Sequence, residues 1–335
     1  MIYIGIDLHA RHFSMAVLDQ DNSIIFEETL PTSSRNLKAA VSAFAEGKSV
    51  VFEESTLAAW AFRVLQPCAD QVVAADPLHN HWIAGDEKSN DVTAARKLAQ
   101  LLRAGLIHPV HHSSEQRQLF KELVLAYHDA TGELVRFKNK LKAKFRQHGI
   151  QCSGQGVYGS RGRDEWLTGL KAAGARFQVS LLWESIDHHH QQKEKLRGEI
   201  ARQCKAFRAI EAFGHVPGIG LIRAATFFAI IDTPHRFADK RKVWAYCGLG
   251  VVGRQSDQMI GPKHLTRSGN RRLKDLAKGA AISAIGMGEN QYARQYRRLL
   301  TKGIKAENAR LTVARAIIST LYAMWRDDTQ YQPRT

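Results

Sequence analysis

No proline occurs between Pro109 and Pro217, and this gap constrains the fold more than any other feature of the sequence. Proline breaks helix interiors, so roughly a hundred proline-free residues permit long, uninterrupted helices. Apolar residues recur there at spacings of three and four, which is typical of amphipathic helices. The first series is Leu123, Tyr127, Ala130, Leu134, Phe137, Leu141 and Phe145; a less regular one includes Leu182, Ile186, Leu196 and Ile200. A Gly-rich stretch at 153–162 separates them, so residues 111–212 are predicted to form a coiled-coil helical hairpin.

The first 110 residues have the pattern of an α/β domain. Short β-rich runs at 2–7, 13–17 and 24–26 precede a predicted helix at 36–45. A buried strand at 49–54, a helix at 58–65, a strand at 71–75 and a helix at about 91–104 follow. Strands that alternate with helices predict a mainly parallel sheet with clustered strand ends.

Two of these strands end in an acid. Asp7 ends the first, and Glu53 follows the apolar run of the fourth; Glu54 is adjacent, but Glu53 comes directly after the run and is preferred. An acid at a strand end is often only a turn or capping residue. Together with Asp91, however, the two acids predict a metal site, because two hard Mg²⁺ ions need several carboxylate oxygens that converge from separate elements.

The charge of the chain is unevenly distributed. Residues 1–110 hold 9 Lys and Arg against 13 Asp and Glu, a net charge of −4, so the rest of the chain carries +20. This division suggests that one part holds a polyanion and that carboxylates in the other act on it. A generally basic soluble protein would have a similar total. Charge therefore favours nucleic acid as the partner without establishing it.

Several basic or glycine-rich segments are candidates for phosphate contact. The turn at 216–220 resembles a helix-hairpin-helix, whose glycines bring backbone N–H groups close to phosphate, although a plain turn between helices has the same pattern. His188, His189 and His190 are interpreted as surface residues, since no second ligand cluster is evident. The predicted nucleic-acid contacts are Lys138, Lys142, Arg146, Gly218, Gly220, Arg254, Lys263, Arg267, Arg271 and Arg272.

The N-terminal third resembles the RuvC-like domain of the DEDD insertion-sequence transposases, the family that includes the Piv-type DNA invertases. The resemblance rests on I-G-I-D at 4–7, the strand that ends at Glu53, and S-N-D-V-T-A-A-R-K-L-A at 89–99. The family's K-T-D-x-x-D-A-x-x-L-A matches with Leu98 and Ala99 in register. Asp7, Glu53 and Asp91 then correspond to the first three acids, and the fourth falls on Ala94. Ala94 indicates either a degenerate natural copy of such a transposase or, as we favour, a substitution that was introduced to inactivate the enzyme.

The last third resembles the transposase domain of the same family. An A-Y-C-G-L segment at 245–249 precedes Ser256, which matches the family's serine nucleophile. The segment at 261–273 resembles the family's S-K-x-G-N segment, with Thr266 in place of the usual Ser. Val251 and Asp257 depart from the family's Pro and Gly. The resemblance implies a RuvC/RNase H-like domain at 1–110, the helical hairpin at 111–212 and a mainly helical transposase domain at 213–335.

The function that this resemblance implies is DNA recombination guided by a non-coding bridge RNA, with Mg²⁺ and a phosphoserine intermediate. Donor and target DNA and a dimer or tetramer of the chain are the expected partners. A RuvC-like structure-selective nuclease, a protein-guided Piv-type invertase and a catalytically dead relative are the alternatives. No apolar run is long enough to span a bilayer, and the spacing of Cys68, Cys152, Cys204 and Cys247 predicts reduced thiols, so a cytoplasmic protein is expected.

Overall fold

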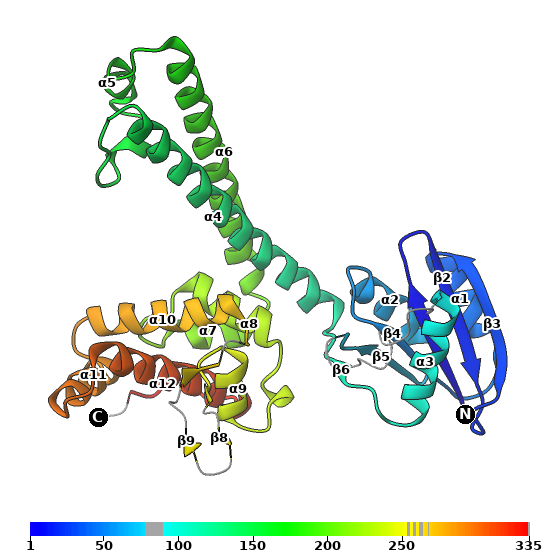
Figure 1. The fold of residues 1–335 in the computed structure, drawn as a ribbon. Helices are drawn as coiled ribbons and strands as arrows, with labels where there is room; N and C mark the ends of the chain where they lie inside the picture. Colours follow the sequence, from blue (N-terminus) through cyan, green and yellow to red (C-terminus); the bar gives the residue numbers. More distant parts are fainter. Residues whose placement is uncertain (78–89, 253–254, 257–258, 261–263, 267, 334–335) are drawn as a thin grey trace. The chain divides into compact units, whose positions relative to one another are not determined.

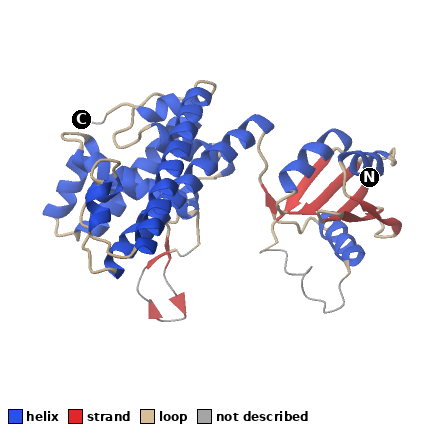
Figure 2. Ribbon diagram, turned by 90° about the horizontal axis from the view of Figure 1, so that it is seen from above, coloured by secondary structure: helices blue, strands red, loops and turns tan. Residues whose placement is uncertain are grey.

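The computed structural model describes residues 1–77, 90–252, 255–256, 259–260, 264–266 and 268–333 (Figure 1). The chain divides into two compact units, Met1–Gln118 and Leu119–Thr335. The first holds a sheet with three helices, and the second is almost entirely helical among its described residues (Figure 2). Each unit has a hydrophobic core of its own, so each is described separately.

A six-stranded mixed sheet forms the centre of the first unit, with strand order β3-β2-β1-β4-β5-β6. The prediction of a mainly parallel sheet was wrong: only the pairs β1–β4 and β4–β5 are parallel. Short turns join β1 to β2 and β2 to β3, and such turns allow only antiparallel pairing. The strands are β1 (Ile2–Leu8), β2 (His12–Leu18), β3 (Ile24–Pro31), β4 (Lys48–Glu53), β5 (Gln71–Ala75) and β6 (Pro109–Val110).

The two faces of this sheet carry different helices. Ile6 and Phe52 lie in the core shared with α1 (Ser34–Ser42) and α2 (Ala58–Leu65). Side chains alternate along a strand, so the residues next to Ile6 on β1 and next to Phe52 on β4 face the opposite side of the sheet. There Val51 packs with Leu98 of α3 (Asp91–Arg103). Helices therefore cover both faces, and among the described residues α3 is the helix that covers the second face.

Gly5 allows α3 to approach β1 more closely than any other residue would. A Cβ atom at this position would lie 1.9 Å from the carbonyl oxygen of Ala95 and 2.7 Å from the backbone nitrogen of Ala99. Both are backbone atoms of α3, so only a shift of the whole helix could relieve the overlap. The carboxylate of Asp91 depends on the same helix for its position.

We therefore expect Gly5→Ala to destabilise the first unit by about 3 kcal/mol or more, the upper range for overpacked cores. Urea unfolding followed by circular dichroism measures this change. Gly132→Ala is the matched control, because a Cβ there meets nothing within 4 Å and the residue lies inside a helix. That control should stabilise the chain by about 0.5–1 kcal/mol. Equal effects at the two positions would contradict the packing argument.

Two long helices, α4 (Glu115–Gln147) and α6 (Ala173–Cys204), dominate the first part of the second unit (Figure 1). They run antiparallel: Leu141 and Phe145 of α4 share a buried cluster with Val179 and Trp183 near the start of α6. The connecting segment contains the 3₁₀ turn Gly156–Tyr158 and α5 (Arg163–Thr168). Its Val157 carbonyl accepts a 2.8 Å hydrogen bond from Nε1 of Trp183. The predicted pair of helices separated by a Gly-rich stretch is present.

The remaining helices pack around one apolar core. Its centre is α8, whose residues from Ala224 to Ile231 are all buried. None of the described helices is both long and apolar enough to cross a membrane. The four cysteines, all among the described residues, are free thiols as predicted. The helices are α7 (Arg208–Gly214), α8 (Leu221–Ile231), α9 (Lys240–Tyr246), α10 (Arg271–Gly286), α11 (Gln291–Thr301) and α12 (Ala306–Arg326), and the strands are β7 (Val251–Val252), β8 (Gln255–Ser256), β9 (Met259–Ile260) and β10 (His264–Leu265).

Candidate active site

The three predicted acids come from three elements of the first unit and gather on the α3 side of the sheet. Asp7 has the same strand alternation as Gly5, and Glu53 has that of Val51, so both side chains face α3. Asp91 is the first residue of α3, because the side chain of Asn90 caps the helix by accepting from the Thr93 N–H at 2.8 Å. Strand pairing therefore fixes the backbone positions of Asp7 and Glu53, and the helix cap fixes that of Asp91.

Helix α3 is also tied to the far edge of the sheet. Arg96 donates from Nε and Nη2 to the two carboxylate oxygens of Glu27 on β3, at 2.7 and 2.9 Å. Such a two-point arrangement fixes direction as well as distance. Together with the close contact at Gly5, it holds the N-terminal end of α3 over β1 and β2.

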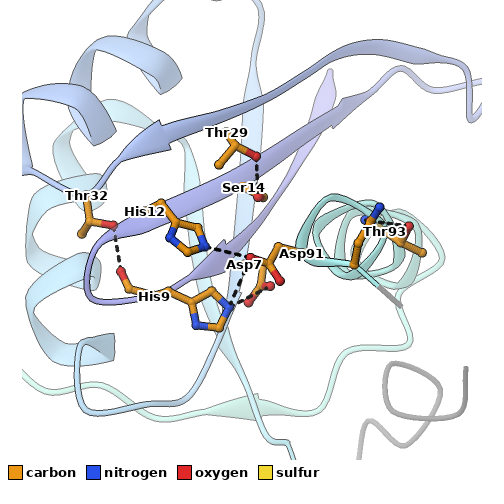
Figure 3. A network of polar contacts seen from close by, with 9 residues as sticks. Asp7, His9, His12, Ser14, Thr29, Thr32, Asp91 and Thr93 are labelled. Atoms are coloured by element: carbon orange, nitrogen blue, oxygen red, sulfur yellow. Dashed lines mark hydrogen bonds and ion pairs between the residues drawn. The ribbon is translucent and has the colours of Figure 1, made fainter. Parts of the chain in front are cut away.

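Two histidines connect Asp7 and Asp91 (Figure 3). Nε2 of His9 lies 3.2 Å from Oδ2 of Asp7 and 3.9 Å from Oδ2 of Asp91. Nε2 of His12 lies 2.8 Å from that same Asp91 oxygen. One ligand atom each from Asp7, His9 and Asp91 fall within 4.8 Å of one another, so the three could bind a single divalent cation. Carboxylate oxygens suit hard divalent cations, and first-row transition metals also accept an imidazole nitrogen.

Glu53 and Glu54 have different surroundings. Burial raises the pKa of Glu53, and the negative charge of Asp7 raises it further, which places Glu53 within electrostatic reach of the site. Glu54 pairs instead with Nε2 of His112 at 2.8 Å. These surroundings favour Glu53 as the second acid, although it is not one of the three residues whose ligand atoms converge.

Ala94 lies one helical turn after Asp91. Residues three apart are neighbours on a helix surface, so a side chain at 94 shares the face of Asp91. Ala94 packs, partly buried, against the apolar cluster of Val51, Ala75 and Leu98. A carboxylate at this position would stand on the same side of the sheet as Glu53, and its absence leaves the site one acid short.

Burial also raises the pKa of Asp7, more than the nearby charges of His9 lower it. The ionised carboxylate is therefore disfavoured in the folded chain. As the pH falls toward this pKa, Asp7 takes up a proton in the folded chain at a higher pH than it does in the unfolded chain. The free energy of unfolding should accordingly decrease as the pH rises through that range. At neutral pH, a divalent cation would relieve the cost of the buried charge.

We expect Asp7→Asn to raise the melting temperature by a few degrees at pH 7 in the presence of a chelator. The difference should shrink as the pH falls and Asp7 becomes protonated. Added Mg²⁺ should stabilise the unmodified chain and leave the variant almost unchanged, because binding to the folded state alone raises stability. Differential scanning fluorimetry measures both changes. A destabilised variant that gains equally from Mg²⁺ would contradict this assignment.

Ser256 lies in the short strand β8, where it pairs with Met259 of β9 in an antiparallel hairpin. The predicted contacts Arg254, Lys263 and Arg267 lie outside the described residues. Thr266 is buried, and its hydroxyl shares a 2.7 Å hydrogen bond with that of Ser268. Because Thr266 is enclosed, it is a weaker candidate nucleophile than sequence position alone suggests.

The predicted basic contacts on α4 differ in their surroundings. The ammonium groups of Lys138 and Lys142 lie 4.8 and 5.2 Å from the ring centroid of Tyr158. Lys142 also donates to the Gly154 carbonyl at 2.8 Å. Arg146 is exposed near the end of the helix. Two of the three cations therefore help to hold the connecting segment, and Arg146 is the most open to a phosphate.

The glycine turn at 216–220 connects α7 and α8, and its two glycines have different roles. Gly218 has φ +85° and is buried; a Cβ there would lie 2.2 Å from the Ala280 carbonyl oxygen of α10. Helix packing thus accounts for Gly218, which was predicted as a phosphate contact. Gly220 is exposed at the N-terminus of α8. Arg271 is exposed at the start of α10, whereas Arg272 pairs with Asp129 of α4.

Sequence reasoning missed His9 and His12. Both follow Asp7 in the segment L-H-A-R-H at 8–12, which lies between the predicted strands at 2–7 and 13–17. Metal-ligand spacing in that segment was the available signal. It was not decisive, because the pairing of His12 with Asp91 depends on residues 79 positions apart.

Comparison with known proteins matches two separate parts of the chain. The family model of the DEDD transposases of the IS110 type matches residues 4–150, which include Asp7, Glu53 and Asp91. The model of the transposase IS116/IS110/IS902 family matches residues 210–297, which include Ser256. A solved structure of Thermus thermophilus RuvC with a Holliday junction substrate is 15% identical, with a TM-score of 0.26, and covers 33% of this chain and 99% of that one.

Proteins of insertion elements are similar to parts of the chain. The IS110 protein of Streptomyces coelicolor is 30% identical over 159 residues, 47% of this chain and 38% of that protein. The IS116 protein of Streptomyces clavuligerus is 29% identical over 40% of this chain and 34% of its own length. A Sinorhizobium fredii protein named as a transposase is 21% identical over 82% of this chain and 69% of its own. With both family models matched, the chain belongs to the IS116/IS110/IS902 family of DEDD insertion-sequence transposases.

Proposed function

We propose that the chain is an insertion-sequence DNA recombinase that cuts and rejoins DNA with a divalent cation, Mg²⁺ in the family, at Asp7, Glu53 and Asp91. The convergence of Asp7 and Asp91 from a strand and a helix carries this proposal. A divalent cation held there would withdraw charge from a phosphate oxygen. The chain's own contribution is to fix the carboxylates in space through β1, β4 and α3.

Ser256 is the proposed nucleophile. Its hydroxyl oxygen would form a bond to phosphorus as one phosphodiester P–O bond breaks, the hydroxyl proton leaves, and the released sugar oxygen takes up a proton. The product is a phosphoserine link that retains the cut end for rejoining. Because Ser256 and the carboxylates belong to different units, the reaction requires the two units, of one chain or of two protomers, to come together.

Nucleic acid is the proposed partner of the basic part of the chain. Exposed Arg146 and Arg271, together with the amide end of α8 at Gly220, offer phosphate contacts on the second unit. We propose that a bridge RNA reads the DNA by base pairing, so protein contacts would be mainly to phosphate and sugar. Cytoplasmic localisation is part of the same proposal.

Extraction of nucleic acid from the purified protein tests this function directly. A discrete small RNA that co-purifies, and that is needed for recombination of a matching plasmid, would support an RNA-guided recombinase. Recombination without RNA would support a protein-guided invertase. Cleavage of branched DNA that needs neither RNA nor Ser256 would indicate a structure-selective nuclease.

Self-association through the long helices is a further part of the proposal. Phe177 and Leu181 of α6 are 66% and 44% exposed, and the open groove beside Leu181 is lined by Phe137 of α4. An apolar face of this kind favours a protein partner, and we propose a second copy. Light scattering should show a dimer that Phe177→Asp with Leu181→Asp converts to a monomer, whereas Glu184→Ala on the same helix should not. A monomeric unmodified chain at micromolar concentration, with RNA and DNA present, would refute the proposal.

A further inference from the structure

We propose that His9 is a ligand of the catalytic cation and takes the place of the carboxylate missing at Ala94. The site would then combine carboxylate oxygens with an imidazole nitrogen, and it would bind Mn²⁺ more tightly than Mg²⁺. This inference rests on the metal-dependent function proposed above, and it assigns a ligand that the four-acid pattern of the family does not include.

The distances around His9 fit one shared cation. Ligands of an octahedral ion with bonds near 2.1 Å lie about 3 Å apart when adjacent and about 4 Å apart when opposite. Nε2 of His9 is 3.2 Å from Oδ2 of Asp7 and 3.9 Å from Oδ2 of Asp91. The same nitrogen therefore stands within ligand spacing of both carboxylates, on a side chain that is 51% exposed and open to substrate.

The backbone of His9 is held in place on both sides. Its N–H donates to the His12 carbonyl at 3.0 Å. Its own carbonyl accepts from the Thr32 hydroxyl at 2.7 Å (Figure 3). These bonds close the turn between β1 and β2, so the backbone of His9 holds the imidazole side chain near Asp7. A ligand placed by the fold in this way loses little freedom when it binds.

His12 has a different role in the same arrangement. Its Nε2 lies 2.8 Å from Asp91 Oδ2, and its ring centroid is 5.4 Å from that of His9. A group that hydrogen-bonds a ligating carboxylate orients it and tunes its affinity for metal. His12 is thus a positioning residue for Asp91, and His9 is the ligand.

The donor set decides which cation is preferred. Mg²⁺ is small and hard and takes oxygen ligands almost exclusively, whereas first-row transition metals also accept imidazole. In a site of four carboxylates, a histidine would be superfluous. With Ala94 in the fourth position, the imidazole of His9 can supply the missing donor, because its ligand atom lies within 4.8 Å of those of both Asp7 and Asp91.

Mn²⁺ titration of the full chain without nucleic acid tests the proposal. We expect pulsed electron paramagnetic resonance to detect an imidazole nitrogen coupled to bound Mn²⁺ in the unmodified chain. His9→Ala should remove that coupling and weaken Mn²⁺ binding by about tenfold or more, judged from the effect of losing even outer-shell partners. His190→Ala, which removes an exposed histidine on α6, is the matched control and should change neither result.

A second background separates a ligand from a structural residue. In Ala94→Asp, the new carboxylate should raise the affinity for Mg²⁺ and reduce the effect of His9→Ala, because two changes that share one ion are not additive. Retained nitrogen coupling in His9→Ala, or equal losses of affinity in both backgrounds, would overturn the assignment. These measurements need no DNA, so they test the role of His9 separately from the proposed function. The ligand assignment can fail even if recombination is demonstrated, and it can hold even if recombination is not observed.

Discussion

Ser256→Ala is expected to abolish the covalent link between this protein and DNA. Reaction mixtures that contain a divalent cation and a variant with all four acids should hold a protein–DNA adduct that survives detergent and disappears after protease treatment. Removing the hydroxyl removes the attacking atom, so no adduct can form. DNA binding should be almost unchanged, since one hydroxyl contributes little among many phosphate contacts.

Ser268→Ala is the matched control for this experiment, because it deletes a hydroxyl from the same part of the chain. Ser268 is exposed and hydrogen-bonded to the buried Thr266, and its loss should leave the adduct intact. Mapping the linkage to Ser268 or Thr266 by mass spectrometry would refute the assignment. Undiminished cleavage by Ser256→Ala would favour a nuclease that uses an activated water.

Strands β1 to β5 of the first unit could be predicted because each carries its own local pattern, whereas the two-residue strand β6 (Pro109–Val110) was not predicted. The runs at 2–7 and 49–54 are β-rich and bounded by turns, and the structure places β1 and β4 there. Their order in the sheet could not be read in the same way. Pairing depends on turn length, and the short turns around β2 produced the antiparallel half of the sheet.

Sequence patterns indicated the candidate residues that lie at the ends of predicted elements. They did not indicate the residues whose importance depends on tertiary contacts. Asp7 and Glu53 end predicted strands, and the parallel pairing of β1 with β4 brings these two strand ends to the same edge of the sheet. His9 has no local pattern, and its significance comes from its distance to Asp91, which is far away in the sequence. Gly218 shows the opposite case: a motif suggested a ligand, and the packing of α10 explains the glycine.

Ala94→Asp is expected to raise recombination by at least about tenfold in a plasmid assay with matching RNA and DNA, since even outer-shell partners of a metal contribute that much. Position 94 is one turn from Asp91 and partly buried beside Val51 and Ala75, so a carboxylate there would face the acids of the strand ends. Burial of that charge should lower the melting temperature without metal, and Mg²⁺ should restore it.

Ala94→Asn is the matched control, because the amide has nearly the same size and carries no charge. If the added side chain acted only by filling space, both variants would change activity alike. If the carboxylate completes the cation site, only Asp should raise the rate and the affinity for Mg²⁺ together. Full activity of the unmodified chain with no gain in Ala94→Asp would contradict the argument that a missing fourth acid limits this chain.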